Sequence, residues 1–453
     1  MVGTAFLPAQ AANGAPALQN VNWSEYLGGP DRNHASPLSQ INRGNVQALA
    51  VAWTYRSGDF GQMQANPLVI DGTLYSVTGT ATLFALDAAT GKEKWRLAPP
   101  KPSALRTLRG VSYWTDGKIR RILYCVDDSL CSVDADTGKI DRQFGEEGRV
   151  SLRAGLGAAA EKMFITSTTP GTVFEDLIIM PTRVGETEGS APGHIQAFHI
   201  RTGRLVWVFR TIPAPGEYGH ETWPADAQAK GHAGGANCWA GMAVDRARGL
   251  LFVPTGSATP DFWGGDREGE TLFANCLLAL DARTGERRWH HQIVHHDLWD
   301  RDLPAPPNLV TLKREGKTID AVAQITKSGH VFVFERETGA PVFPIDEVPV
   351  PASSVPGEKA WPTQPVPRAP RPFARQELTV DDLNPYSKNR DEIVEEFKRL
   401  RTGAFVPFSL DQGTLLFPGF DGGGEWGGAA VDESGVMYVN ASEMAWIGRL
   451  GKA

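Results

Sequence analysis

A short segment rich in histidine, aromatic and acidic residues holds the first candidates for chemistry in this chain. It reads His295-His-Asp-Leu-Trp-Asp300, and Asp302 follows two residues later. A carboxylate within reach of a hydroxyl group can take its proton, and Asp300 is a candidate for such a base. The alternative is that Asp300 only caps a turn. His295 and His296 are adjacent, so on a strand they point to opposite faces, and a metal shared between them is not expected.

The cysteines exclude two further kinds of site. Cys125, Cys131, Cys238 and Cys276 form neither a CxxC nor a CxxCH pattern, so neither a zinc knuckle nor an attached haem is indicated. Their even number allows disulfides in an oxidising compartment. Buried free thiols are the equal alternative.

Charge and hydropathy exclude two classes of partner. The 453 residues carry a net charge of −7 with both signs spread along the chain, and without a basic block nucleic acid is not an expected partner. No run reaches the roughly 18 to 20 apolar residues that a membrane helix needs. The 49 glycines, 32 prolines and 13 tryptophans are typical of many short strands joined by turns.

The first 20 residues predict the remnant of an export signal. They are uncharged and partly apolar, and Ala9-Gln10-Ala11 fits a small-x-small cleavage site. A basic region and a long apolar run are missing, so we interpret residues 1–20 as the tail end of such a signal, with a disordered arm as the alternative. The signal would place the protein in the periplasm, or at the periplasmic side of a membrane.

A repeat sets the expected architecture. Ala85-Leu-Asp-Ala-Ala-Thr-Gly-Lys-Glu-Lys-Trp95 recurs at 279–289 and, less closely, at 197–207. Weaker copies, ending at Gly138 and Gly339, lack the tryptophan. In each copy an apolar strand is followed by a tight Thr-Gly turn, where glycine supplies a positive φ.

A single hairpin of this kind cannot bury its own apolar face, so the units must stack. Tryptophan at a fixed offset would pack against the neighbouring unit, and radial stacking gives a β-propeller. We therefore predict an all-β fold for residues 21–453, with a proline-rich and helical insertion at about 341–403. Within it, Asp391–Arg401 is the one convincing helix, because its apolar positions recur at helical spacing.

The repeat and several local motifs together resemble the dehydrogenases that depend on pyrroloquinoline quinone. The similarity runs from Asn22-Trp-Ser-Glu-Tyr to Trp426-Gly-Gly, and His295-His-Asp-Leu-Trp-Asp300 with Pro304-Ala-Pro-Pro resembles the glucose and quinate branch. Thr107-Leu108 stand where methanol- and ethanol-type relatives have adjacent cysteines. The resemblance implies an eight-bladed propeller with the quinone on its axis, in which the last blade could be incomplete.

The resemblance also assigns roles to particular residues. Asp300 would be the base, and Lys327, in Thr326-Lys-Ser-Gly-His, would stabilise charge on the reduced quinone. Trp239 would stack on the flat quinone, and Arg109 would pair with one of its carboxylates. The alternatives are a solvated loop lysine, a tryptophan that packs between blades and a surface ion pair. Further cofactor contacts are expected from Gln64, where many relatives have glutamate, Thr168 and Trp426.

The family holds calcium, or a lanthanide in one branch, against the quinone. Glu186 is the expected glutamate ligand, with Glu188 as its rival, and Asp300 would share the ion. Where the family has an asparagine ligand this chain has Ser257, a poorer ligand than an amide carbonyl. Calcium prefers several hard oxygens, carboxylates among them, so this departure puts the strength of the metal site in doubt.

The expected function is the oxidation of a hydroxyl group of a sugar, polyol or alcohol by hydride transfer to the quinone. Ubiquinone or a cytochrome c would take the electrons onward. A non-catalytic propeller scaffold would share the repeat, and a truncated, inactive fragment of such an enzyme is a further alternative. A scaffold would not need Asp300, Lys327, Arg109 and Trp239 together, and their co-occurrence favours the enzyme.

Overall fold

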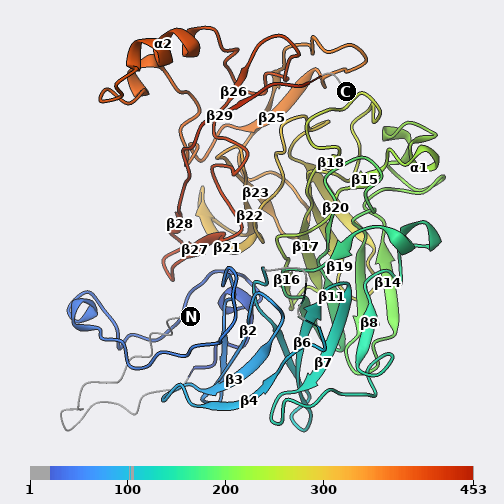
Figure 1. Ribbon diagram of the computed structural model, residues 1–453, viewed down its shortest axis with the longest axis vertical. Coiled ribbons are helices and arrows are strands. Elements are labelled where there is room, and N and C mark those ends of the chain that lie inside the picture. Colours follow the sequence, from blue (N-terminus) through green and yellow to red (C-terminus); the bar gives the residue numbers. More distant parts are fainter. Residues whose placement is uncertain (1–20, 102, 104–106, 452–453) are drawn as a thin grey trace.

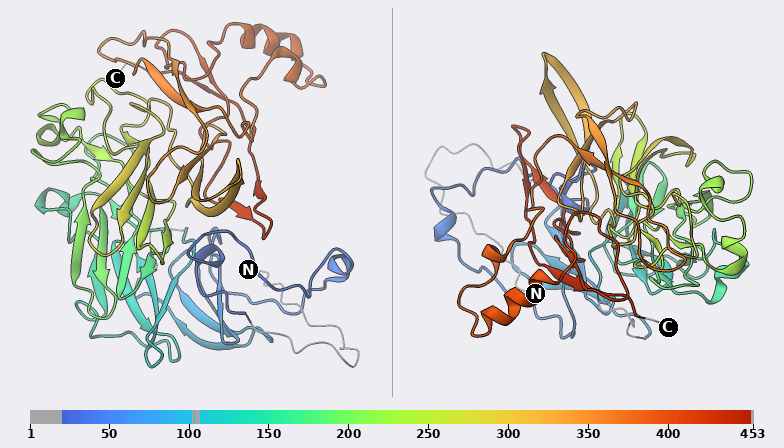
Figure 2. Two further views of the ribbon diagram at one scale, coloured as in Figure 1. Left: turned by 180° about the vertical axis from the view of Figure 1, so that it is seen from behind. Right: turned by 90° about the horizontal axis from the view of Figure 1, so that it is seen from above.

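The repeat folds into twisted antiparallel sheets that follow one another around an arc, from blue to red in Figure 1 and, seen from behind, in Figure 2. The computed structural model describes residues 21–101, 103 and 107–451. Four sheets have four strands each. Their strands are β1 (Leu68–Ile70), β2 (Thr73–Val77), β3 (Leu83–Asp87) and β4 (Glu93–Leu97); β5 (Ser112–Thr115), β6 (Arg120–Val126), β7 (Ser129–Asp134) and β8 (Arg149–Ser151); β10 (Thr172–Phe174), β11 (Leu177–Met180), β13 (Ile195–His199) and β14 (Leu205–Phe209); and β16 (Ala243–Asp245), β17 (Leu250–Pro254), β19 (Cys276–Asp281) and β20 (Arg287–Gln292).

A three-stranded and a two-stranded sheet continue this series. They contain β21 (Asn308–Arg314), β22 (Lys317–Ile325) and β23 (Val331–Glu335), and then β27 (Ala429–Val431) and β28 (Met437–Val439). Smaller pairs are formed by β9 (Ile165–Thr166) with β12 (Arg183–Val184), β15 (Gly234–Gly235) with β18 (Ala258–Thr259), β24 (Ile345–Pro349) with β25 (Thr363–Pro367), and β26 (Thr414–Leu416) with β29 (Trp446–Gly448). The helices are α1 (Ala227–Lys230), α2 (Arg390–Lys398) and five short 3-10 turns at 26–28, 46–48, 158–162, 220–222 and 380–382.

The first strands of the sheets lie side by side near the middle of the molecule. Strand β10 contacts β5 and β16, and β21 contacts β16 and β27. The core lies between neighbouring sheets, where Phe174 and Ile179 of one sheet pack with Val244 and Leu251 of the next. This radial arrangement of β-sheets is the one the repeat predicts. The count of eight blades stays a prediction.

The indole ring of each repeat tryptophan packs against the Thr-Gly turn of the next unit. The indole of Trp207 donates a hydrogen bond to the carbonyl of Ala282 (3.2 Å), and its ring covers Gly285 so closely that an added Cβ would lie 2.5 Å from it. Trp95 stands in the same way over Gly138, and Trp289 over Gly339. The φ of Gly285 is +77°, which glycine adopts without strain. The Thr-Gly step therefore forms the turn and also provides the surface against which the neighbouring indole packs.

The N-terminal segment ties several sheets together. The buried guanidinium of Arg32 donates to the carbonyls of Met242 (2.8 Å) and Tyr26 (2.7 Å) and to the hydroxyl of Thr172 (3.2 Å). One residue further on, the carbonyl of Asn33 accepts from the amide of Val431 (2.9 Å). The segment thus joins the sheets that begin with β10, β16 and β27.

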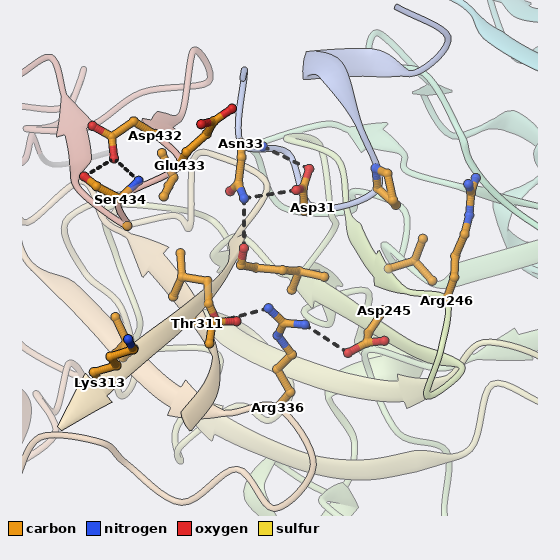
Figure 3. Close-up of a pocket in the computed structure, with 17 residues that line it drawn as sticks. Asp31, Asn33, Asp245, Arg246, Thr311, Lys313, Arg336, Asp432, Glu433 and Ser434 are labelled. Atoms are coloured by element: carbon orange, nitrogen blue, oxygen red, sulfur yellow. Dashed lines mark hydrogen bonds and ion pairs between the residues drawn. The ribbon is translucent and has the colours of Figure 1, made fainter. Parts of the chain in front are cut away.

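Beside this segment lies a large cavity of about 970 Å³, shown in Figure 3. Asn33 donates to Asp31 (3.1 Å) and to the carbonyl of Leu309 (2.9 Å) on one side. On the other, Arg336 pairs with Asp245 at 3.1 Å. The charged groups of these pairs are already partnered within the protein. The cavity opens where β16 ends.

Other expectations can be compared with the structure. All four cysteines are buried free thiols, so the disulfide alternative is wrong. The predicted helix at 391–401 is α2, at the periphery of the molecule within the predicted insertion. Among the described residues, no helix has the length and apolar character to cross a membrane. The predicted arm of residues 1–20 lies outside the described residues.

Candidate active site

The loops at one end of the sheets bring the predicted site residues together. In an antiparallel sheet, the loop before the first strand and the loop after the second strand leave from the same end. Trp239 precedes β16, Ser257 follows β17, Asp300 precedes β21 and Lys327 follows β22. These loops surround a cavity of about 380 Å³ at the opposite ends of the strands from the cavity of Figure 3. Eight predicted site residues line it: Gln64, Arg109, Thr168, Glu186, Trp239, Ser257, Asp300 and Lys327.

Asp300 and Lys327 form an ion pair inside this cavity. Lys327 Nζ lies 2.9 Å from Asp300 Oδ1 and 3.6 Å from Asp302 Oδ2. Burial raises the pKa of Asp300 well above its usual value, although Lys327 opposes the shift. Burial lowers the pKa of Lys327, but the Asp302 and Asp300 carboxylates outweigh that effect and raise it. Lys327 therefore stays positively charged, and the neighbouring carboxyl group of Asp300 takes up a proton at a higher pH than an ordinary aspartate does.

Asp297 supports the turn that presents Asp300. Its carboxylate accepts hydrogen bonds from the backbone amides of Trp299 (2.9 Å) and Arg301 (2.6 Å) and from Asn275 Nδ2 (2.9 Å). Within this turn Asp300 has a φ of +55°, a conformation that is costly for a residue with a side chain. The network around Asp297 stabilises this unusual backbone and so fixes the direction of the Asp300 side chain.

Arg301 joins the Asp300 turn to the Lys327 loop. Its buried guanidinium donates to the carbonyl of Lys327 (3.2 Å) and to those of Pro418 (2.6 Å) and Gly419 (3.2 Å). Asp300 and Lys327 are therefore held both by their own ion pair and by a backbone link between their loops.

Trp239 is held by the second carboxylate of the turn. Its indole Nε1 donates to Asp302 Oδ2 at 2.9 Å, and the backbone amide of Ser257 donates to the other oxygen. Burial raises the pKa of Asp302, but Lys327, Ser257 and Trp239 outweigh it and keep this pKa below its usual value. A charged Asp302 therefore fixes the plane of the indole beside the cavity.

Arg109 lies between two indole rings. Its guanidinium carbon is 5.3 Å from the ring centre of Trp239 and 5.0 Å from that of Trp426, within the range of cation–π attraction. It donates to the hydroxyls of Thr168 (2.9 Å) and Thr169 (3.2 Å). Trp426 does not line the cavity, but it contacts Arg109, which does. The predicted residues Arg109, Thr168, Trp239 and Trp426 thus form one contiguous group.

Two buried polar atoms in this cavity indicate a polar ligand. Gln64 Oε1 and Arg109 Nε are buried and have no hydrogen-bond partner, a condition that is costly unless a ligand completes it. One is an acceptor and the other a cationic donor. A flat ligand with carboxylates matches Arg109, which offers a guanidinium, and Trp239, which offers a flat face, while an N–H group on the ring would match the acceptor Gln64 Oε1. The residues present therefore fit pyrroloquinoline quinone.

The excess of acidic residues in the cavity favours the binding of a cation as well. Six acidic side chains line it against three basic ones, so this wall repels an anionic quinone unless a cation or protons neutralise the carboxylates. Glu186 lines the cavity and pairs with Arg183 at 3.8 Å. Its rival Glu188 does not line it, and lies 3.2 Å from His232 instead. Carboxylates suit a hard ion such as calcium, so the donor set fits the metal that the family implies.

Ser257 is less suited to be a metal ligand than Glu186 is. Its hydroxyl donates to Asp297 and accepts from Asn275 Nδ2 at 3.2 Å, so both bonds direct it into the protein. The histidines of the motif also lie away from the cavity lining. His295 Nδ1 lies 2.6 Å from Gln292 and His296 Nδ1 lies 2.8 Å from the carbonyl of Gly269, as expected for structural histidines.

The sequence analysis missed several residues that line the cavity. Asn237 stands two residues before Trp239, and Glu425 directly before Trp426, so proximity to a predicted residue could have identified both. Asp261 had no such signal. Burial, followed by the charges of Asp302 and Asp300, raises the pKa of Asp261 to about 9.

Comparison with known proteins agrees with these features. Residues 23–453 match the family model described as "PQQ: Glucose/ethanol/alcohol dehydrogenase, beta-propeller domain". The chain is 35% identical to a quinoprotein glucose dehydrogenase of Gluconobacter oxydans, an alignment that covers 98% of this chain and 59% of the relative. It is 31% identical to a quinate/shikimate dehydrogenase (quinone) of Acinetobacter baylyi, over 95% of this chain and 58% of the relative. The chain thus spans less than two thirds of the length of these relatives.

Among solved structures, the quinohemoprotein alcohol dehydrogenase from Comamonas testosteroni superimposes with a TM-score of 0.71 at 22% identity, over 96% of this chain and 59% of that one. At this identity the similarity speaks for the fold alone. It agrees with the radial sheets and tryptophan contacts described above. Together with the family model, these findings show that the chain belongs to the pyrroloquinoline-quinone-dependent dehydrogenase family, with relatives in its glucose and quinate branch.

Proposed function

We propose that the protein oxidises a hydroxyl group of a sugar, polyol or alcohol by hydride transfer to pyrroloquinoline quinone. The observation that carries the proposal is the meeting of Asp300, Lys327, Trp239 and Arg109 in one cavity, although four separate loops supply them. The names of relatives, among them glucose, quinate/shikimate and glycerol dehydrogenases, agree with this substrate class.

The protein's own residues would perform the proton transfer and hold the reactants. Asp300 takes the proton of the substrate hydroxyl, so that the carbon can release its hydrogen with both bonding electrons. When bound, the quinone supplies the acceptor for that hydride. Lys327 stabilises the negative charge that develops beside it. Because the raised pKa of Asp300 matches a group that takes up a proton and later releases it, the aspartate can return to its starting state after each turnover.

Binding would use the remaining side chains. Trp239 stacks on the flat ring, while Arg109 and Gln64 bind its polar edge through the two atoms that have no partner in the protein. Thr168 orients Arg109, and Trp426 supports the guanidinium from its other side. Calcium would be held by Glu186 and Asp300, with Ser257 near by, and would neutralise part of the acidic wall.

Location and electron acceptor follow from the same proposal. The cleavage-like Ala9-Gln10-Ala11 supports export to the periplasm, where ubiquinone in the adjoining membrane or a cytochrome c could take the electrons. The proposal also includes a closed ring of eight blades, as the resemblance implies.

Reconstitution tests this function. The purified protein would be mixed with pyrroloquinoline quinone and calcium, and reduction of a dye followed with aldoses, polyols, quinate and simple alcohols. We expect quinone-dependent dye reduction with at least one of these substrates. Tight quinone binding without dye reduction on any of them would contradict the proposed activity. Absence of quinone binding would contradict the proposed cofactor.

A further inference from the structure

We propose that Asp261, a residue that the resemblance does not assign, is a direct ligand of the hard cation in this cavity. It would provide the oxygen that Ser257, in place of the family's asparagine, does not offer. The inference rests on the proposed function for the position of the cation, but it concerns metal binding by the protein itself. It can therefore be tested without quinone or substrate.

The first observation is the isolation of the Asp261 carboxylate. Asp261 lines the cavity and is only 8% exposed. Among the described residues, none forms a hydrogen bond or an ion pair with it. The other carboxylates of this wall do have partners: Asp300 and Asp302 contact Lys327, and Glu186 pairs with Arg183. A buried carboxylate that no protein donor satisfies is costly, unless a cation or a proton compensates it.

The second observation is the position of Asp261 relative to Ser257. The two residues are four apart, and both line the cavity from the segment that includes β18 (Ala258–Thr259). The hydroxyl of Ser257 is engaged by Asp297 and Asn275, so it is turned into the protein. Asp261 therefore offers an unengaged oxygen on the same wall at which the usual amide ligand is missing.

The third observation is the identity of the surrounding groups. Asp261 shares the cavity with Glu186, Asp300 and Asp302. Lys327 forms its ion pairs with Asp300 and Asp302 and not with Asp261. Oxygen-rich, acidic surroundings select hard cations such as calcium over softer transition metals. A divalent cation bound at Asp261 would satisfy the carboxylate that the protein leaves without a partner, and Glu186 lies on the lining of the same cavity.

A competing group of metal-capable residues lies elsewhere and serves as a control. Glu188, His232 and Asp266 have ligand atoms within 4.8 Å of one another. Glu188 is exposed and already pairs with His232 at 3.2 Å. A mixed site of imidazole and carboxylate suits transition metals better than calcium, so we expect this group to contribute nothing to calcium binding.

The experiment measures calcium binding by the protein without quinone. Isothermal titration with calcium chloride would be combined with terbium luminescence, which nearby tryptophans such as Trp239 sensitise. The test variant is Asp261→Asn, which keeps the size of the side chain and removes its charge. The matched control is Asp266→Asn, the same change in the competing group. We expect Asp261→Asn to raise the calcium dissociation constant at least ~10-fold and Asp266→Asn to leave it unchanged.

Thermal unfolding separates a ligand from a merely structural residue. Since the Asp261 carboxylate has no partner in the protein, Asp261→Asn should leave the melting temperature without calcium unchanged or higher. The increase in melting temperature that calcium produces should be smaller than in the native protein at the same calcium concentration. A second variant, Ser257→Asn in the Asp261→Asn background, should recover part of the calcium affinity, because it restores an amide oxygen on the same wall.

The outcomes distinguish this inference from the proposed function. Unchanged calcium affinity in Asp261→Asn would overturn the inference, and so would a loss of affinity in Asp266→Asn alone. If the native protein binds calcium through Asp261 but reduces no dye after reconstitution, the metal ligand stands and the proposed oxidation fails. If dye is reduced and Asp261→Asn binds calcium normally, the oxidation stands and the inference fails.

Discussion

The indole nitrogen of Trp239 donates a hydrogen bond of 2.9 Å to the carboxylate of Asp302. This bond joins the flat wall of the cavity to the turn that carries Asp300. The same carboxylate lies 3.6 Å from Lys327 Nζ. The stacking surface, the base and the cation therefore form one connected structure.

This bond can be separated from the stacking surface by substitution at Trp239. Trp239→Phe keeps a flat ring and removes the donor, whereas Trp239→Leu removes both. We expect Trp239→Leu to weaken quinone binding about 5-fold, because an aromatic contact contributes about 1 kcal/mol, and Trp239→Phe to weaken it less. Quenching of protein fluorescence by added quinone measures both. Equal losses would mean that the hydrogen bond, and not the ring face, determines affinity.

Removal of the proposed base should lower turnover even when quinone and calcium are saturating. Asp300→Asn cannot accept the substrate proton, so kcat should fall about 10²- to 10⁴-fold under those conditions. In the native enzyme kcat/KM should fall with decreasing pH, at a pH well above the usual aspartate pKa, since burial raises the pKa of Asp300. Dye reduction across a pH series checks both. Full activity in Asp300→Asn would rule out this base.

Asp297 should matter for positioning although it does not line the cavity. Asp297→Asn replaces one of the two accepting oxygens by an NH₂ group, which then faces the backbone amide of either Trp299 or Arg301. One buried donor then loses its partner, which costs about 1 to 3 kcal/mol of stability. We expect a lower kcat with little change in quinone affinity. Urea denaturation and steady-state kinetics measure the two effects, and a variant with native stability and native kcat would contradict the supporting role.

The tryptophan contacts can be tested with two glycines of nearly equal backbone. Gly285 has a φ of +77° and lies under Trp207, whereas Gly316 has a φ of +76° and nothing within 4 Å of an added Cβ. Both alanine variants carry the strain of a positive φ, about 1 kcal/mol. Only Gly285→Ala also pushes against the indole, so we expect it to lose about 1 to 3 kcal/mol more. Equal losses in urea denaturation would show that the indole contact adds nothing.

Buried histidines should make the fold sensitive to acid. Burial lowers the pKa of His194 to about 3 from its ordinary 6.5. The unfolded chain therefore binds a proton below pH ~6.5 that the folded chain does not, and stability falls as the pH falls, by up to about 1.4 kcal/mol per pH unit for one such group.

His194→Gln should remove this contribution of His194 to the acid sensitivity. Between about pH 7 and pH 5, the unfolding free energy of the variant should therefore decline by about 2 kcal/mol less than that of the native protein. Partly buried His290 and buried His296, whose pKa values burial lowers to about 4, should continue the acid sensitivity of both proteins. Parallel urea curves at the two pH values would test this. An equal decline in native protein and variant would contradict a neutral His194.

The sequence by itself determined the repeating unit. A strand, a Thr-Gly turn and a tryptophan at fixed spacing are local patterns, and local sterics decide that only glycine suits the turn at Gly285. The same pattern requires stacking, since one hairpin cannot bury its face. The resemblance then identified eight of the 19 residues that line the cavity, from Gln64 to Lys327.

Only the tertiary structure decided which side chains have partners. Glu186 and Glu188 are two residues apart and equal by sequence, but one lines the cavity and the other pairs with His232. Ser257 turns its hydroxyl into the protein, and Asp261 is left without a partner on the same wall. Such differences depend on contacts between residues far apart in the chain, because burial and the surrounding charges are set by the packing of whole sheets and not by the neighbours in sequence.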